Sequence, residues 1–331
     1  MIGLKSALYA ATCVFAVATV SQPTDARAEN WKAYSFISVA SHPIHLSLEA
    51  LGKEIEEVSE GKISVKVNVG GSLPITGTSI TQAIGDGILT LAHDGYYTGN
   101  LPIGAISMLP MLAPDYDAFQ RMVGKVEPAL AEELLTKGVT LLATYNMPSQ
   151  TLWGVGELRG LDDLEGLKLR VGNVPIAEFA RRQGAIPVTL ASGDVAPALE
   201  RSVVGGIVTA SAGGGRLWGD MLKYNYRLPL NYDLMLIVVN TEAFESLDPE
   251  LQEKVREAAR KSAAQLTADV AALEDSTTEE LKTKGLVVTL PTDEEIRQAR
   301  EGIRNYWPEW AKNVGPDAEK LLAEVISAVG E

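Results

Sequence analysis

LDDLEGLKLRV, residues 161–171, ends in alternating apolar positions that predict a β-strand over residues 167–171. Asn173 follows as a helix N-cap, and Gly184 ends the helix that begins there. A strand that leads directly into a helix is typical of α/β proteins, whose ligands bind beyond the carboxyl ends of the strands. Arg170, at the end of this strand, could therefore hold a carboxylate with two parallel hydrogen bonds. A surface arginine paired with a neighbouring acid explains the same spacing equally well.

Strand and helix patterns alternate on both sides of this stretch and predict an α/β fold. Strands are expected at residues 34–40, 62–69, 88–92, 139–144, 151–155, 186–190 and 203–209. Helices are expected at residues 42–59, 76–84, 116–123 and 128–137, and a short helix begins at Ser192 or Asp194.

A long helical pattern runs from Pro249 to Lys284 without an internal proline or glycine. Asp248 supplies a start signal and Gly285 a stop signal. At 1.5 Å per residue such a helix would be about 50 Å long, more than a single lobe needs. Its apolar positions do not keep a coiled-coil heptad, so we expect a helix that spans two lobes.

Residues 1–28 have the layout of a secretory signal peptide. Lys5 precedes an apolar run over residues 7–20, and Ala26-Arg27-Ala28 forms an A-x-A cleavage pattern. The run is shorter than the roughly 20 residues that a membrane span needs, although an uncleaved anchoring helix remains the alternative. We expect cleavage after Ala28 and a mature protein in the periplasm. Cys13, the sole cysteine of the sequence, would be removed with this segment.

The charge balance excludes some partners. The formal net charge is −14, and no basic cluster is longer than Arg181-Arg182. Such a chain is a poor candidate for binding nucleic acid or an anionic membrane. An anionic small molecule remains possible, because a single arginine can dominate a local site.

The stretch at residues 161–171 resembles the D-L-x-G-x-K-x-R-V signature of DctP-type (P-type) TRAP transporter solute-binding proteins. Further matches follow in the same order along nearly the whole chain, at Gly61-Lys62-Ile63, Gly85-Asp86-Gly87, Gly184-Ala185-x-Pro187-Val188, Asp194 to Glu200, Val203-Val204-Gly205-Gly206 and Val238-Val239-Asn240. Each match is weak, and together they are strong.

The resemblance implies a two-lobed α/β periplasmic binding protein (type II-like) with a hinge and a long helix spanning both lobes. Lobe I would comprise residues 29–147 plus 235–277, and lobe II residues 148–234 plus 278–331, with crossings near 146–150 and 232–235. In that family the arginine matching Arg170 pairs with the ligand carboxylate, the lobes close, and the receptor delivers its ligand to TRAP membrane permease subunits. A monomer without catalytic residues, cofactor or metal is implied.

Some positions depart from the family pattern. Gln150 stands where many members carry a second arginine, and Ser192 and Ala196 replace an aromatic pair. Val204-Gly205-Gly206 is followed by Thr209 instead of the usual asparagine. The departures imply a ligand larger or less anionic than a sialic acid or a C4-dicarboxylate, such as an aromatic or branched monocarboxylate.

Residues of the opposite lobe complete the expected site. Asp94-Gly95-Tyr96-Tyr97 follows a strand, so Tyr97 could stack on a ligand ring, although a core tyrosine is an equal alternative. The candidate ligand-binding residues are Arg170, Gln150, Tyr97, Thr209, Asn173, Asp94, Ser38 and Ser192. Trp153 and Trp218 are interpreted as packing residues.

Two other classes of function remain open. One is a binding protein that reports its ligand to a membrane sensor. The other is a periplasmic hydrolase with Ser211 or Asp94 as a catalytic residue, although the sequence around Ser211 lacks the first glycine of a G-x-S-x-G elbow. His42 and His45 are three residues apart, but no thiol and no ordered set of carboxylates completes a zinc site with them.

Overall fold

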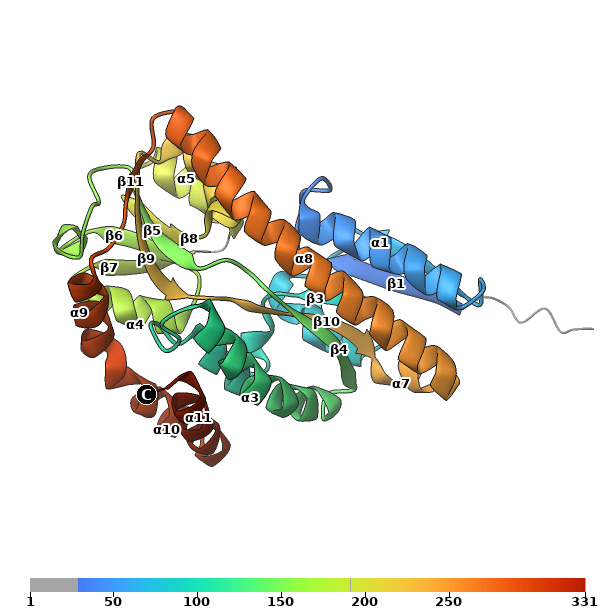
Figure 1. Cartoon of the computed structure of the whole chain (residues 1–331). Coiled ribbons are helices and arrows are strands. Elements are labelled where there is room, and N and C mark those ends of the chain that lie inside the picture. The colour runs from blue at the N-terminus through green and yellow to red at the C-terminus, as the bar shows by residue number, and fades with distance from the viewer. Residues whose placement is uncertain (1–28, 191, 331) are drawn as a thin grey trace, which may run out of the picture.

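Two β-sheets, one in each lobe, organise the chain (Figure 1). The structure is a computed structural model that describes residues 29–190 and 192–330. The expected signal peptide at residues 1–28 lies outside the described residues. Within them, no helix is both long enough and apolar enough to cross a membrane.

The sheet of the first lobe has the strand order β2-β1-β3-β10-β4. β1 pairs in parallel with β2 and β3, whereas β10 is antiparallel to both of its neighbours. The strands are β1 (Glu29–Ser35), β2 (Ile63–Asn68), β3 (Leu91–Asp94), β4 (Val139–Asn146) and β10 (Leu234–Asn240). The parallel pairing of β1 with β2 explains why the first strand begins at Glu29, ahead of the expected Tyr34.

The sheet of the second lobe has the order β11-β9-β5-β8-β6-β7. β6, which carries Arg170, lies between β7 and β8 and is parallel to both. The strands are β5 (Gln150–Gly154), β6 (Lys168–Val171), β7 (Ile186–Thr189), β8 (Gly206–Thr209), β9 (Tyr224–Asn231) and β11 (Val287–Thr289).

The chain crosses between the sheets at residues 147–149, from β4 to β5, and at residues 232–233, from β9 to β10. The two crossings contact each other, because the Met147 N–H donates a hydrogen bond to the Asp233 carbonyl at 2.9 Å. They coincide with the segments expected to form the hinge.

Helices cover the sheets and fill the loops between strands. The α-helices are α1 (Pro43–Val58), α2 (Ile80–Gly85), α3 (Tyr116–Leu135), α4 (Val174–Arg182), α5 (Val195–Glu200), α6 (Arg216–Trp218), α7 (Thr241–Glu245), α8 (Pro249–Thr283), α9 (Asp293–Arg304), α10 (Tyr306–Val314) and α11 (Pro316–Val329). The tighter turns are η1 (Gly77–Ser79), η2 (Tyr97–Gly99), η3 (Pro102–Met108), η4 (Asp162–Leu164), η5 (Ser192–Asp194) and η7 (Gly219–Met221), with a π-helical turn, η6 (Ser211–Gly215).

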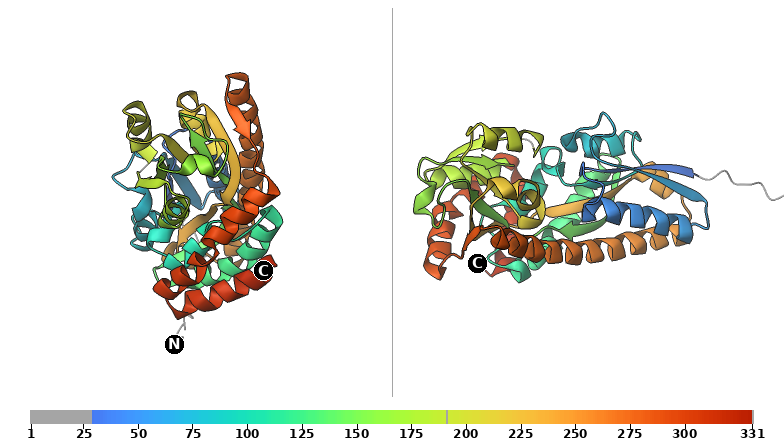
Figure 2. Two further views of the ribbon diagram at one scale, coloured as in Figure 1. Left: turned by 90° about the vertical axis from the view of Figure 1, so that its left-hand side faces the viewer. Right: turned by 90° about the horizontal axis from the view of Figure 1, so that it is seen from above.

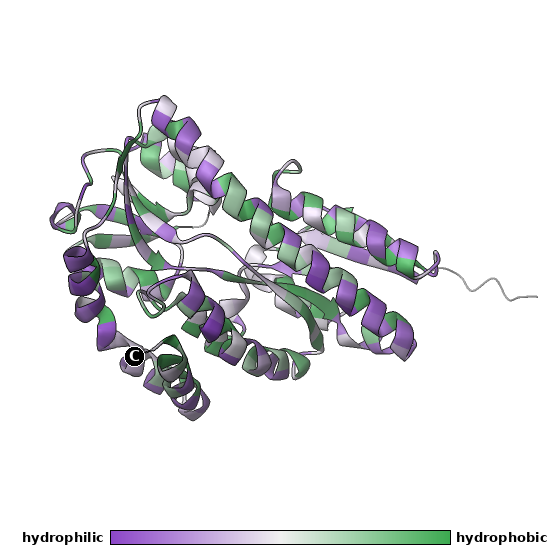
Figure 3. Cartoon of the chain, viewed as in Figure 1, coloured by the Kyte–Doolittle hydropathy of each residue, from purple (hydrophilic) through white to green (hydrophobic). Residues whose placement is uncertain are grey.

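The 35-residue helix α8 runs along both lobes (Figures 1 and 2). Asp248 caps its start by accepting the Leu251 N–H at 2.9 Å, and Gly285 follows its end with a φ of 101°. Hydrophilic and hydrophobic bands alternate along α8 (Figure 3). Its apolar side chains from Leu251 to Val270 join a core of the first lobe, and Leu281 joins a core of the second. The predicted two-lobed fold with a spanning helix is confirmed.

The helix α3 is continuous where two separate helices were expected. Pro128 lies inside it and removes one backbone hydrogen bond, a change that costs about 3 kcal/mol in a helix interior. Phe119, Val126 and Leu130 are fully buried on either side of the proline. Burial of this apolar face therefore outweighs the break signal that the sequence carries.

The C-terminal segment divides between the lobes, although all of residues 278–331 was expected in lobe II. β11 pairs with β9 of the second sheet. α10 and α11 continue to α3 of the first lobe, where Arg121 Nε donates to the Ala328 carbonyl at 2.8 Å. Leu322 and Val325 are buried in the same core as α3. The apolar face of α11 is therefore satisfied by a helix of the opposite lobe.

Candidate functional site

A cavity of about 250 Å³ lies between the lobes. The first lobe contributes the end of β1, the start of α1 and the loop after β3. The second lobe contributes the ends of β6 and β8, the start of α4 and the turn η6. The crossings add Met147 and Asp233. The cavity therefore lies at the carboxyl ends of strands of both sheets, where α/β proteins bind ligands.

The Arg170 guanidinium faces this cavity from β6. Its Nε and Nη2 donate to the Leu190 carbonyl at 3.1 and 2.8 Å, and its Cζ lies 5.8 Å from the centroid of the Trp218 ring. Burial lowers the pKa of Arg170, an effect that Tyr96 partly opposes, yet an arginine stays protonated in proteins. None of the ion pairs among the described residues involves Arg170. A half-buried cation without a counter-charge is suited to binding an anion.

Gln150 and Asn173 lie on the same wall as Arg170. The Asn173 Oδ1 accepts the Ile176 N–H at 2.9 Å, which confirms the predicted N-cap of α4. Its Nδ2 approaches the Met108 sulfur of the opposite lobe at 3.8 Å. Gln150 donates to the Pro148 carbonyl through a long contact of 3.4 Å. The amide of Gln150 is therefore weakly held and able to turn to a ligand.

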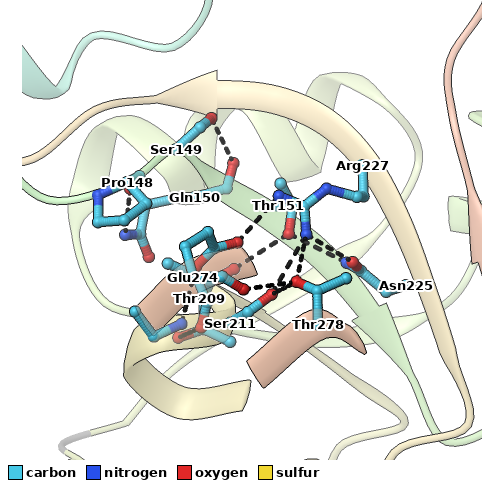
Figure 4. Close-up of polar contacts among 12 residues, drawn as sticks. Pro148, Ser149, Gln150, Thr151, Thr209, Ser211, Asn225, Arg227, Glu274 and Thr278 are labelled. Atoms are coloured by element: carbon cyan, nitrogen blue, oxygen red, sulfur yellow. Dashed lines mark hydrogen bonds and ion pairs between the residues drawn. The ribbon is translucent and has the colours of Figure 1, made fainter. Parts of the chain in front are cut away.

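Thr209 ends β8 and fixes the turn η6 that follows it (Figure 4). Its Oγ1 accepts the Gly214 N–H at 2.8 Å, and its carbonyl accepts the Trp153 Nε1–H at 2.9 Å. Thr209, Ala210, Gly213 and Gly214 all line the cavity. The Thr209 hydroxyl thus shapes the cavity wall by holding the backbone of η6 at Gly214.

A buried ion pair behind η6 joins this wall to α8 (Figure 4). Arg227 Nη2 donates to Glu274 Oε1 at 2.9 Å, and the Ala212 N–H donates to Glu274 Oε2 at 2.7 Å. Arg227 Nη1 also donates to the hydroxyls of Ser211 and Thr278 at 3.2 and 3.1 Å. Sequence reasoning missed this pair, because 47 residues separate its members.

Three predicted residues lie outside the cavity wall. Asp94 is buried and accepts bonds from the Thr81 hydroxyl at 2.6 Å and the Tyr96 N–H at 3.0 Å. Burial raises its pKa to about 6. Tyr97 is fully buried, since η2 begins there and turns its ring into the core. Ser211, the alternative nucleophile, is fully buried and hydrogen-bonded to Thr278 at 2.7 Å.

Other side chains take their places on the wall. Ser38 and Ser192 line the cavity as expected residues, both exposed. Tyr96 and Trp218 also line it, whereas the sequence favours Tyr97 as the ligand-facing tyrosine and predicts Trp218 to be a packing residue. Asp233 lines the cavity too, although it belongs to no sequence motif. Its position in the segment expected to cross between the lobes is the one feature of the sequence that indicates a place near the ligand.

His42 connects the two lobes beside the cavity. Its Nδ1 accepts the Ile44 N–H at 3.2 Å and so caps α1. Burial lowers the pKa of His42, while a hydrogen bond to the Ala212 backbone of the opposite lobe acts against that effect. The imidazole is therefore neutral at pH 7 and bridges α1 and η6.

The chain matches a family model described as "Bacterial extracellular solute-binding protein, family 7" (DctP) over residues 35–313. A solute-binding protein of Chromohalobacter salexigens is 27% identical over 209 residues, a match that spans 61% of this chain and 61% of that protein. The sialic acid-binding periplasmic protein SiaP of Vibrio cholerae is 24% identical over 84% of this chain and 87% of its own. The structure of DctP7 from Bordetella pertussis, an extracytoplasmic solute receptor binding pyroglutamic acid, superposes with a TM-score of 0.82 at 20% identity, covering 90% of this chain and 99% of that one.

Proposed function

Because the chain belongs to the bacterial extracellular solute-binding proteins of family 7, the DctP-type receptors of TRAP transporters, we propose that it binds a small organic acid between its lobes and delivers it to TRAP permease subunits. The observation that carries this proposal is the Arg170 guanidinium, which faces the interlobe cavity and has no acidic partner among the described residues. A carboxylate would accept hydrogen bonds from its planar fork and neutralise a charge that burial disfavours.

The walls of the cavity favour a monocarboxylate with an apolar part. Met108, Met147, Met235 and Trp218 give much of the surface apolar character. Asp233 on the same wall would repel a second carboxylate. Pyroglutamic acid, bound by DctP7, and sialic acid, bound by SiaP, are both monocarboxylates.

The size of the cavity narrows the ligand further. Ligand sites for drug-sized molecules usually enclose about 300–1,000 Å³, and this cavity of about 250 Å³ lies below that range. We therefore favour an acid smaller than a sialic acid, such as a branched or cyclic monocarboxylate. This narrows the expectation from the sequence, which allowed a larger ligand.

Binding would couple to closure of the lobes about the crossings at residues 147–149 and 232–233. The free energy that favours the closed state must come from contacts made in that state alone. In this structure Asn173 of the second lobe approaches Met108 of the first at 3.8 Å, and His42 of the first lobe bonds to the Ala212 backbone of the second. A carboxylate on Arg170 would add contacts of the same kind.

A thermal-shift screen tests the proposal. The panel comprises pyroglutamate, branched and aromatic monocarboxylates, C4-dicarboxylates, uronates and sialic acid, each beside its neutral amide as a control. Ligand at 100 times its Kd should stabilise the protein by about 2.7 kcal/mol. Stabilisation by an acid and not by its amide supports the proposal, and a panel without any stabilising acid overturns it.

The proposed location has its own test. We propose that export removes residues 1–28, so that the mature chain begins at Glu29 in the periplasm. N-terminal sequencing of the protein recovered from a periplasmic extract should start at Glu29. A protein recovered from the membrane fraction with Met1 retained would contradict cleavage.

A further inference from the structure

Asp233 faces the interlobe cavity from the crossing between β9 and β10. Arg170 and Asp233 are the charged side chains among the described residues that line this cavity. The wall therefore carries one positive and one negative group. Arg170 comes from a strand end of the second lobe, whereas Asp233 belongs to the segment that joins the lobes.

Two hydrogen bonds fix the position of Asp233. The Asn231 Nδ2 donates to its Oδ1 at 2.7 Å, and the Asp233 carbonyl accepts the Met147 N–H at 2.9 Å. Its side chain is thus held by the end of β9, and its backbone by the crossing from β4 to β5. Among the described residues, none donates a hydrogen bond to Oδ2 or forms an ion pair with this carboxylate. Oδ2 is an acceptor with unused capacity on a cavity wall.

The surroundings of Asp233 disfavour a bare carboxylate. Burial raises its pKa to about 6, and the bond from Asn231 acts against this effect. At pH 7 the group is still mostly ionised, so its desolvation must be offset by a donor. Tyr96, on the same wall, experiences both charges, since Arg170 lowers and Asp233 raises the pKa of its hydroxyl after the larger effect of burial. Tyr96 is therefore close to both charged groups.

We propose that Asp233 selects, among small organic acids, those that also carry a hydrogen-bond donor, an N–H or O–H group, which binds its Oδ2 while Arg170 holds the carboxylate. This inference rests on the proposed function and specifies its substrate class. A donor on the ligand completes the bonding of a buried carboxylate, and a hydrogen bond to a charged group is about twice as strong as one between neutral groups. An acid with only acceptors would leave Asp233 desolvated and unpaired.

Matched pairs of acids test the inference in wild-type protein by titration calorimetry. The pairs are pyroglutamate with the lactone in which a ring oxygen replaces its N–H, and α-hydroxyisovalerate with α-ketoisovalerate. Where the screen finds an acid outside these pairs, its N-methyl or O-methyl derivative is the donor-free partner. A hydrogen bond to a charged group contributes about 1.5–3 kcal/mol, and about 1.4 kcal/mol corresponds to tenfold in affinity. We therefore expect the donor-bearing member of each pair to bind about tenfold or more tightly.

Variants assign the preference to one side chain. Asp233→Ala should reduce the difference within each pair to about twofold or less, since the acceptor is gone. Asp220→Ala removes a carboxylate that is 82% exposed and should leave the preference unchanged. If Asp233→Ala does not fold, Asp233→Asn keeps the shape and should weaken the preference and raise the relative affinity for C4-dicarboxylates.

The outcomes separate the inference from the proposed function. Equal binding of both members of each pair by wild-type protein, or a preference that survives in the Asp233 variants, overturns the role of Asp233. Binding of acids that still depends on Arg170 would then leave the proposed function intact. A wild-type protein that binds no acid overturns both.

Discussion

Replacing Arg227 with alanine should destabilise the protein strongly, because the change leaves a buried carboxylate without its counter-ion. The Glu274 side chain is 7% exposed and that of Arg227 is 23% exposed. In the variant, Glu274 would keep the Ala212 N–H, bonded at 2.7 Å, as its donor. Breaking a buried ion pair from one side costs about 3–5 kcal/mol, so we expect a loss in this range.

The reciprocal change should cost less. In Glu274→Gln, Arg227 retains its bonds to the hydroxyls of Ser211 and Thr278 at 3.2 and 3.1 Å and reaches solvent. We expect a loss of about 1–3 kcal/mol, the range for an imperfectly satisfied buried polar group. The double variant should then be more stable than the sum of the single changes implies, by about 0.5–3 kcal/mol.

Urea unfolding at pH 7 measures these differences from the shift of the transition midpoint. Arg297→Ala is a matched control, because the Arg297 side chain is 56% exposed and its acidic partners are exposed as well. Exposed pairs contribute about 0–1 kcal/mol. An Arg227→Ala variant that loses no more free energy of unfolding than this control would refute the reasoning.

Three further predictions concern the cavity and its surroundings. Burial raises the pKa of Asp94 from 3.8 to about 6, so the free energy of unfolding of the wild-type protein falls as pH rises through this window. Asp94→Asn does not ionise and should therefore be more stable than wild type above about pH 6, by up to about 3 kcal/mol. Thermal melts that show the same difference between variant and wild type at pH 4 and at pH 8 would contradict this. Gly214→Ala would press a Cβ against the Trp218 ring and should lower stability by about 1–3 kcal/mol and acid affinity with it, whereas Gly156→Ala, which meets no atom within 4 Å, should be neutral in the same melts. Gln150→Arg should move the ligand ranking in the thermal-shift panel toward dicarboxylates, and an unchanged ranking would count against a role for Gln150 in the site.

Local signals in the sequence predict much of the fold. Asn173 and Asp248 cap their helices as expected, because capping depends on a side chain and an N–H three residues away. The absence of proline and glycine over residues 250–284 likewise predicts α8 within about one residue of its end. Pro128 misled the prediction, since the local break signal is outweighed by burial against other parts of the chain.

The candidate site depends on contacts that the sequence does not display. Nothing local distinguishes Tyr96 from Tyr97; the start of η2 turns one toward the cavity and the other into the core. The pair of Arg227 and Glu274 requires β9 and α8 to meet, which is a tertiary event. Asp233 belongs to no sequence motif and reaches the cavity because the chain crosses between the lobes there. Arg170, by contrast, lies within a signature long enough to mark it.

The central claim is that Arg170 holds the carboxylate of the ligand. Calorimetric titration of Arg170→Ala with the acid selected by the screen tests it most directly, with Arg201→Ala as an exposed arginine control from the same lobe. Removing one partner of a buried, hydrogen-bonded charge pair costs about 2–5 kcal/mol, so the affinity should fall by about 30-fold or more while the control binds as wild type does. An Arg170→Ala variant that binds the acid with wild-type affinity would contradict the account.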